Sequence, residues 1–274
     1  MVGGVTDHPN RVGITAPSGD STNRLATTQF VNQNTVASIG GITGPVTLGT
    51  GLTISSAAVL SGTTLAPTAP TYQKFATAGS TNYIRTSSGV LWAKIRMCGG
   101  GGGGGAQITN NGSSGGTTSF GGWTVLGGNG GALGSGTSSG ATGGTGGASG
   151  AGTLILRQPG GNGGGQSLET AGDQVGGYGG HTPFFNGGGM SGLSSGAGDN
   201  GIANTGGGGQ GAGGINTGKN GAGGGSGEYV EFLIVSSSSA IALTVAAGGN
   251  GGAAGNFAGG NGAAGQILVE EFYQ

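Results

Sequence analysis

The chain has 274 residues, of which 76 are glycine, and only 6% of the residues carry a formal charge. The net charge of −1 and the lack of a basic run argue against nucleic-acid binding, because neutralising phosphates requires clustered Lys or Arg. No stretch approaches the roughly 18 apolar residues of a membrane span. The first residues show neither a basic leader nor an apolar signal segment, so we expect a leader-free protein made in the cytosol.

Glycine divides the chain into two parts. Residues 1–96 hold 12 glycines and the remaining 178 residues hold 64, so the composition changes sharply near Met97. The one cysteine, Cys98, stands at this change and excludes an internal disulfide framework. We interpret Cys98 as a small residue that ends a strand rather than as a reactive thiol.

Residues 1–70 are expected to form an elongated shaft or attachment region. A short helix is predicted over 23–36, capped by Thr22 or Asn23, and it is too short to stand alone in water. Val46, Leu48, Leu52 and Ile54 then alternate like a strand interrupted by glycine, and residues 62–71 have the composition of a linker. Such sparse apolar side chains would be buried most simply against copies of themselves about a symmetry axis.

Residues 72–274 are predicted to form one glycine-rich tip domain. Its scaffold, 72–97 and 227–274, contains alternating segments that suit a small antiparallel β-sandwich. In the segment 90–97, alternation places Leu91, Ala93, Ile95 and Met97 on one face of the strand. The strands are predicted near residues 72–77, 82–86, 90–97, 229–235, 240–246 and 266–273, with 154–156 as one more.

The glycine-rich excursion, residues 98–227, opens with seven consecutive glycines and has a period of three. Every third position from 128 to 152 is glycine in seven of nine places, and from 206 to 227 in six of eight. This is the period of the extended polyproline II conformation, which leaves its amides to water or to neighbouring chains. Glycine at every third place lets such legs approach until amides meet carbonyls, so a polyglycine II bundle is predicted in place of an apolar core.

Two other states of the excursion remain open. Disorder is one, because ordering each glycine costs about 0.5 to 1 kcal/mol more than ordering alanine. The strands at both ends of the excursion and its period of three speak against disorder. A collagen-like triple helix is poorly supported, since the whole chain has seven prolines and the glycine phase shifts repeatedly.

Motifs for catalysis, metals or cofactors are weak in this sequence. The segment 213–219 imitates a phosphate loop, but Asn220 replaces the Ser or Thr that would follow the lysine. His8 and His181 have no partners at metal-ligand spacing. Glu270 and Glu271 are adjacent in a predicted strand, so their side chains point to opposite faces and cannot act as an acid–base pair. We therefore expect no enzyme activity, no metal and no cofactor.

Several segments resemble the tail fibres of tailed bacteriophages. Residues 25–31 (LATTQFV) and 48–55 (LGTGLTIS) are similar to shaft elements of these fibres. The segment 84–105, which ends in a strand and the polyglycine run, and the final QILVEEFY at 266–273 are similar to their glycine-rich receptor-binding tip domains. The resemblance implies a homotrimeric adhesin at the distal end of a virion tail fibre, assembled in the host cytoplasm. It also implies attachment to other tail or baseplate proteins through the N-terminal region.

The resemblance further implies that loops at the ends of the legs bind a bacterial outer-membrane protein or a surface glycan. Large side chains, which supply binding energy at low entropic cost, are few in the glycine-rich part. Phe120 and Trp123 suit a local core better, although Trp123 also stays among the candidates. A purely structural or adaptor fibre component and an ice-binding protein are the alternative functions. The candidate receptor-binding residues are Trp123, Tyr178, His181, Phe184, Phe185 and Phe257.

Overall fold

The computed structural model describes residues 69–274, apart from 135–139, 166–172, 184–187, 190–195, 216–218, 236–238, 254–255 and 274, together with the backbone of four short strands nearer the N-terminus. The chain separates into two units, Met1–Ala66 and Pro67–Gln274. In the first unit β1 (Ser38–Ile39) pairs with β2 (Ile42–Thr43), and β3 (Leu52–Ile54) pairs with β4 (Leu60–Gly62), both antiparallel. The helix predicted over 23–36 lies outside the described residues.

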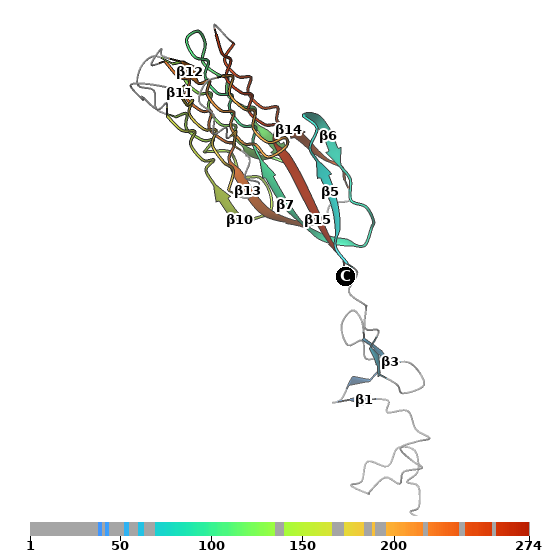
Figure 1. The fold of residues 1–274 in the computed structure, drawn as a ribbon. Helices are drawn as coiled ribbons and strands as arrows, with labels where there is room; N and C mark the ends of the chain where they lie inside the picture. Colours follow the sequence, from blue (N-terminus) through green and yellow to red (C-terminus); the bar gives the residue numbers. More distant parts are fainter. Residues whose placement is uncertain are drawn as a thin grey trace, which may run out of the picture. The chain divides into compact units, whose positions relative to one another are not determined.

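The second unit is mostly β, with two antiparallel sheets, and the described residues contain no helix, which confirms the predicted antiparallel scaffold (Figure 1). The larger sheet has the order β10-β13-β7-β15-β5, and the smaller sheet has the order β6-β14-β8-β9. The strands of the larger sheet are β5 (Thr71–Phe75), β7 (Val90–Cys98), β10 (Thr153–Gln158), β13 (Tyr229–Val235) and β15 (Gln266–Tyr273). Those of the smaller sheet are β6 (Gly79–Tyr83), β8 (Thr118–Phe120), β9 (Trp123–Val125) and β14 (Ile241–Val245). A separate pair joins β11 (Asp173–Gln174) to β12 (Gly214–Ile215).

One hydrophobic core joins the two sheets. Ala93, Ile95 and Met97 of β7 face it, together with aromatic side chains from both sheets. Trp123 of β9 stacks on Phe232 of β13 with ring centroids 4.3 Å apart. Full burial of side chains of this size contributes about 1.5 to 3 kcal/mol each, so this small core anchors the part of the unit that has ordinary side chains.

The prediction that Leu91 shares the core face of β7 is wrong. Leu91 is 45% exposed, whereas its neighbour Val90 is buried. The pairing between β7 and β15 shifts at this point, because Phe272 pairs with Trp92 while Tyr273 pairs with Val90. A bulge of this kind turns the alternation by one residue, so Val90 rather than Leu91 continues the buried row.

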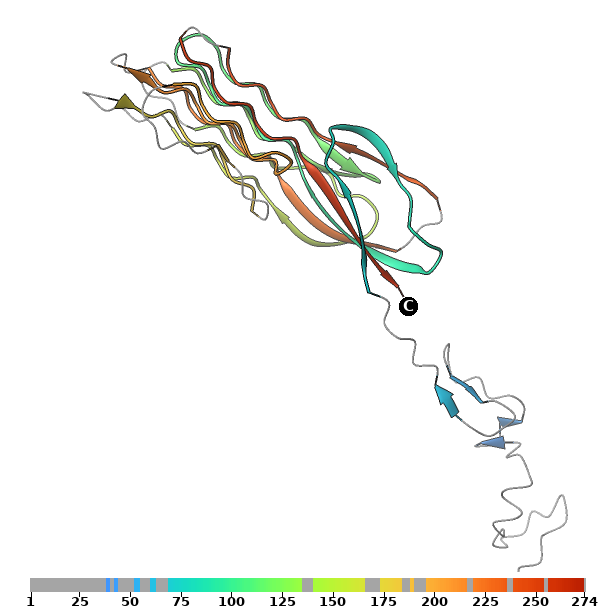
Figure 2. The ribbon, with the colours of Figure 1, turned by 45° about the vertical axis from the view of Figure 1, so that its right-hand side comes forward.

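Beyond the sheets, the glycine-rich segments run side by side as extended legs (Figures 1 and 2). The central leg, residues 99–107, continues directly from β7. The amides of Gly99, Gly102 and Gly105 donate to the carbonyls of Glu228, Gly225 and Ala222, at 2.8 to 3.0 Å. Each step of three residues along the central leg therefore corresponds to a step of three residues backwards along its neighbour, so the two legs are antiparallel.

The other groups of the central leg follow the same rule. Gly100 and Gly103 donate to Gly116 and Ser113, while Gly101 and Gly104 donate to Ala263 and Gly260. The carbonyls accept amides from three further legs, again in steps of three. The central leg thus has six neighbours, and adjacent neighbours are also hydrogen-bonded to one another. These neighbours are residues 110–116, 126–134, 206–212, 221–227, 246–252 and 257–263.

Two of these neighbours are enclosed in the same way. The leg 221–227 is also bonded to 140–144, 160–164 and 176–180, and the leg 206–212 is also bonded to 176–180, 188–189 and 196–201. Within the described residues, three mutually adjacent legs therefore lie at the centre of a hexagonal array, and their glycines are buried. Main-chain hydrogen bonds hold this part of the molecule together, as an apolar core does elsewhere.

Candidate recognition surface on the glycine bundle

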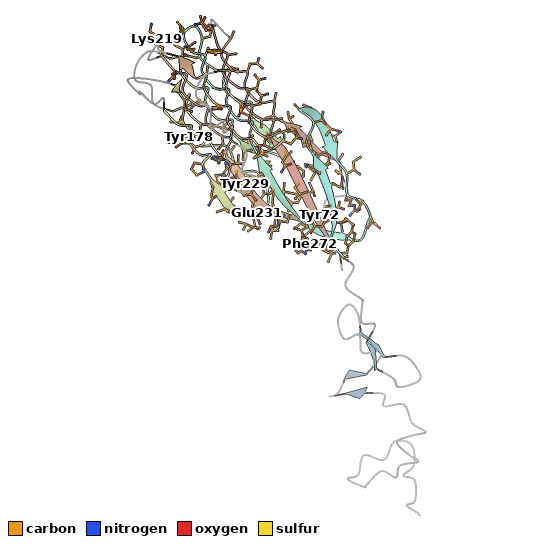
Figure 3. The ribbon with its side chains drawn as sticks, viewed as in Figure 1. Tyr72, Tyr178, Lys219, Tyr229, Glu231 and Phe272 are labelled. Carbon is orange, nitrogen blue, oxygen red and sulfur yellow. The ribbon has the colours of Figure 1, made fainter. Side chains whose placement is uncertain are left out.

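The legs project away from the sheets, and loops connect them at the far end, where Lys219 lies (Figure 3). Residues 107–110 form one described loop, in which the amide of Ala106 donates to the carbonyl of Asn110. Ile108 is 39% exposed in this loop, and the hydroxyl of Thr109 donates to the carbonyl of Ala253. The sequence signal for this loop is the change from seven glycines to Ala-Gln-Ile-Thr-Asn-Asn, and no candidate residue was predicted there.

Tyr178 and His181 are brought together on one leg. They are three residues apart, and their carbonyls accept amides from Gly164 and Gly161 of the neighbouring leg at 2.7 and 3.2 Å. The ring of Tyr178 lies against Gly164, where glycine leaves room for it, and Tyr178 is still 57% exposed. His181 is half-buried and accepts the amide of Gly188 through Nδ1 at 3.2 Å. This leg therefore presents one aromatic and one imidazole side chain on a rigid backbone.

The other candidates do not join Tyr178 and His181. Phe257 is half-buried next to the end of the central leg, where its carbonyl accepts the amide of Gln107. The enclosed leg 206–212 separates Phe257 from Tyr178, because it is bonded to the legs of both. Phe184 and Phe185 lie outside the described residues.

Trp123 lies in the hydrophobic core rather than on a binding surface. It is 2% exposed, and its Nε1 donates to the carbonyl of Ala151 at 2.7 Å. Phe120 is 1% exposed in the same cluster. The core alternative for these two residues is therefore confirmed, since both the apolar surface and the indole N–H of Trp123 are satisfied inside the molecule.

Asparagine side chains take over hydrogen bonds where a surface leg lacks a further neighbour. Asn200 Oδ1 accepts the amide of Asn261 at 2.7 Å, and Asn261 Oδ1 accepts the amide of Gly251 at 2.8 Å. Asn111 Oδ1 accepts the amide of Leu133 at 2.8 Å. These three hydrogen bonds are exposed to solvent, so the asparagine side chains satisfy main-chain amides at the surface of the bundle. Isolated asparagines among glycines are the sequence signal for this role.

A buried carboxylate ties the bundle to the larger sheet. Glu228, at 1% exposure, accepts Arg157 Nη1 at 2.8 Å and the amides of Leu126 and Gly147 at 3.1 and 3.0 Å. Arg157 also donates to the carbonyl of Ala148 and lies 6.0 Å from the centre of the Trp123 ring. This charged pair therefore joins β10, a surface leg and the core, at a site where loss of one partner would leave a buried charge.

A second buried carboxylate, Glu271, joins the two sheets at the opposite end. It accepts the hydroxyls of Thr71, Tyr83 and Thr86 at 2.7, 2.8 and 2.5 Å, the amide of Thr86 at 3.0 Å and Nε2 of Gln73 at 3.1 Å. Burial alone would raise the pKa of Glu271, but the hydrogen bonds from Thr86, Thr71 and Tyr83 outweigh it and lower the pKa below its ordinary value. Glu270 points to the other face, as predicted, where it accepts the hydroxyl of Tyr72 at 2.6 Å.

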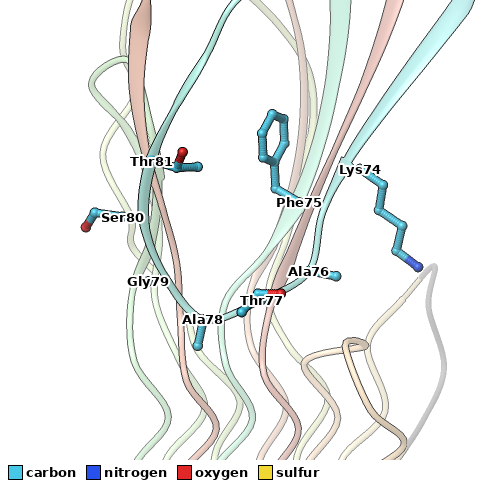
Figure 4. Close-up of a pocket in the computed structure, with 8 residues that line it drawn as sticks. All are labelled: Lys74, Phe75, Ala76, Thr77, Ala78, Gly79, Ser80 and Thr81. Carbon is cyan, nitrogen blue, oxygen red and sulfur yellow. The ribbon is translucent and has the colours of Figure 1, made fainter.

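Two cavities lie among the described residues, and neither is lined by a group of catalytic or metal-binding side chains. One of about 310 Å³ lies inside the β5–β6 connection, where Phe75 and Thr81 point inward while Lys74 and Ser80 point away (Figure 4). Another, of about 420 Å³, is lined by apolar side chains that include Phe120, Ile234 and Ile241. The described residues contain no group of His, Cys, Asp and Glu side chains that could hold a metal ion. Burial raises the pKa of Cys98 to about 12, so this thiol is not activated as a nucleophile.

A search of the described residues for a helix long and apolar enough to cross a membrane found none. Comparison of the chain with family models, curated proteins and solved structures gave no match.

Proposed function

We propose that this chain is a tail-fibre adhesin of a tailed bacteriophage, which attaches the virion to the bacterial surface without catalysis. In this proposal, three copies associate through residues 1–70, and the same region joins other tail or baseplate proteins. The second unit is the distal tip, and its glycine legs are of the polyglycine II type. The receptor is an outer-membrane protein or a surface glycan.

The observation that carries the proposal is the hexagonal array of legs. A bundle with three enclosed legs is stiff, because each amide of the run 99–105 and each carbonyl of residues 100–105 is hydrogen-bonded to a neighbouring segment. Loops held by a rigid scaffold are common sites of binding function. The steps of three residues along every central contact match the period of the polyproline II conformation, which supports the assignment of the legs as polyglycine II.

Tyr178 is the described side chain that best suits a contact with a receptor. It is 57% exposed on a leg whose backbone is fixed on both sides, and His181 extends the same row. An aromatic side chain on a rigid backbone loses little entropy on binding. Many such weak contacts, combined over several copies and several fibres, would give tight attachment through avidity.

Adsorption of the purified full-length chain to bacteria tests the proposal. We expect the chain to bind a susceptible strain and to compete with an infecting phage for it, and we expect host mutants that lose binding to identify the receptor. The change Tyr178→Ala should weaken adsorption by roughly tenfold, which corresponds to about 1.4 kcal/mol.

Tyr72→Ala is the matched control, because Tyr72 is 59% exposed but lies on the larger sheet, away from the bundle. It should leave adsorption unchanged. If no strain of a broad panel binds the chain, the adhesin proposal fails. Binding that survives Tyr178→Ala would instead favour an adaptor role for this leg.

A further inference from the structure

Exposed apolar side chains gather on the larger sheet rather than on the bundle. Among the described residues with large, exposed apolar side chains, six belong to strands of this sheet, and Val235 is the most exposed at 85%. Isolated apolar residues on a surface need no explanation, but a contiguous group indicates an interaction site. The six residues are Tyr72, Leu91, Trp92, Leu154, Ile155 and Val235.

Three apolar side chains form a continuous row across neighbouring strands, which we call the base ridge: Val235 of β13, Trp92 of β7 and Phe272 of β15. Val235 pairs with Trp92, and Trp92 pairs with Phe272. The rings of Trp92 and Phe272 are stacked, with centroids 3.7 Å apart. Ala93, next to Trp92, faces the core, so the ridge lies on the outer face of the sheet.

The charges behind the ridge are paired within the chain. Lys94 pairs with Glu231, and Arg96 lies 3.5 Å from Glu270 and 3.8 Å from Glu231. Two cations thus face two carboxylates, and the hydroxyl of Tyr72 is bonded to Glu270. A strongly charged partner would find no uncompensated charge here, whereas a second copy of the same neutral, apolar surface meets no electrostatic penalty.

The chain also enters the second unit beside the ridge. β5 begins at Thr71, which pairs with Glu271, the residue directly before Phe272. Figure 3 shows Tyr72 and Phe272 at this end of the sheet, opposite the loops of the bundle. Copies held together through residues 1–70 would therefore start their second units close to one another at this end. The free edge of β10 is a poorer contact, because a bulge between Leu154 and Leu156 disrupts it.

We propose that the base ridge is a self-association surface, covered by the same surface of a second copy of this chain. The inference rests on the proposed assembly of several copies, and it adds the surface through which their second units touch. Burial of Trp92, Phe272 and Val235 between copies would remove from water an apolar row on the outer face of the sheet. If the copies are related by an axis along the legs, all bundle loops of an assembly lie at the same end.

The test uses the full-length chain and measures two quantities, the mass in solution and acrylamide quenching of tryptophan fluorescence. The chain has two tryptophans, and the buried Trp123 supplies a constant baseline. We expect the wild type to have the mass of several copies with a protected Trp92. Val235→Asp adds a charge at a side chain that is largely exposed within one copy, so folding should be preserved. For Val235→Asp we expect one of two results. The mass falls to that of one chain, or residues 1–70 keep the copies together and the quenching of Trp92 rises several-fold.

Ile202→Asp is the matched control, because Ile202 is 62% exposed outside the larger sheet, and it should change neither quantity. The inference is overturned if Trp92 is quenched equally in the wild type and in Val235→Asp at all concentrations, which would leave the ridge to another kind of partner. Failure of the proposed function gives a different pattern, since a chain that does not adsorb to bacteria can still protect Trp92.

Discussion

At the scale of single residues, glycine is required in the enclosed legs for steric reasons. A Cβ atom built on any residue of the run 99–105 would overlap a carbonyl oxygen of a neighbouring leg. The requirement for glycine differs from one position to the next. Ala212 and Ala222 are fully buried in the other two enclosed legs, so those two positions accept a methyl group. The run of seven glycines therefore marks the leg with the least room for side chains.

Substitution of one glycine tests this account. Gly102→Ala would force a methyl group against the carbonyl of Asn129, and we expect it to lower the free energy of unfolding by about 1 to 3 kcal/mol or more, the range of overpacked cores. Gly116→Ala is the control, because the nearest atom to its Cβ would be 3.4 Å away. Denaturant unfolding of both variants gives the comparison, and equal stability of the two would contradict the enclosed arrangement.

The sequence predicts some residues better than others. Alternation placed Ala93, Ile95 and Met97 on one face of the strand, and all three are buried. Leu91 was misplaced, because alternation within one strand carries no information about a bulge in its pairing with β15. Tyr178 was a candidate for the loops at the ends of the legs, whereas it lies on a leg, where it is 57% exposed and its ring lies against Gly164.

At the scale of elements, a buried carboxylate links the two sheets in addition to the hydrophobic core. Glu271 of β15 accepts hydrogen bonds from residues of β5 and β6 and from Thr86 after β6. Because the pKa of Glu271 is lowered in the folded state, its ionised form stabilises folding above the ordinary pKa of about 4.5. This contribution is lost as the pH falls through the lowered value.

We therefore expect Glu271→Gln to lower the free energy of unfolding at neutral pH by about 1 to 3 kcal/mol, since an amide replaces one acceptor among several donors. The variant should also lose less stability than the wild type on acidification below about pH 4.5. Glu270→Gln is the control on the outer face and should cost less. Thermal unfolding across the pH range measures both effects, and parallel pH profiles for wild type and Glu271→Gln would refute the role of this carboxylate.

Long strands were predictable from alternation, and the short hairpin of β8 and β9 was not. Each of its strands has three residues, too few for alternation to be recognised. A usable signal was the Gly121–Gly122 pair between aromatic residues, because both glycines have positive φ, 52° and 92°, as a two-residue hairpin turn of type I′ requires.

At the scale of the whole molecule, the second unit replaces much of the usual apolar core with buried main-chain groups. Apolar surface exposed on unfolding raises the heat capacity and polar surface lowers it. We therefore expect a heat-capacity change of unfolding below the ordinary value of about 12 to 15 cal/mol/K per residue. Scanning calorimetry of the full chain measures this change. An ordinary heat-capacity change per residue, calculated over residues 67–274, would contradict this expectation and show that burial of apolar surface dominates.

Which leg lies next to which could not be predicted from the sequence. The period of three indicated legs, but glycine has no side chain to distinguish one neighbour from another. The order of the legs is set instead by the strand from which each leg continues; the central leg, for example, continues from β7. The few Asn, Gln and Ser side chains between legs also contribute to this order. Those contacts connect residues far apart in the sequence, such as Ser113 with Asn250.

The hexagonal array has no natural outer boundary, since a peripheral leg offers the next leg the same kind of groups that it receives from the last one. An insertion that adds one outgoing and one returning segment can therefore widen the bundle laterally without repacking anything inside it. Such modular enlargement sets this architecture apart from a conventional interior, where each added side chain must find a complementary hole.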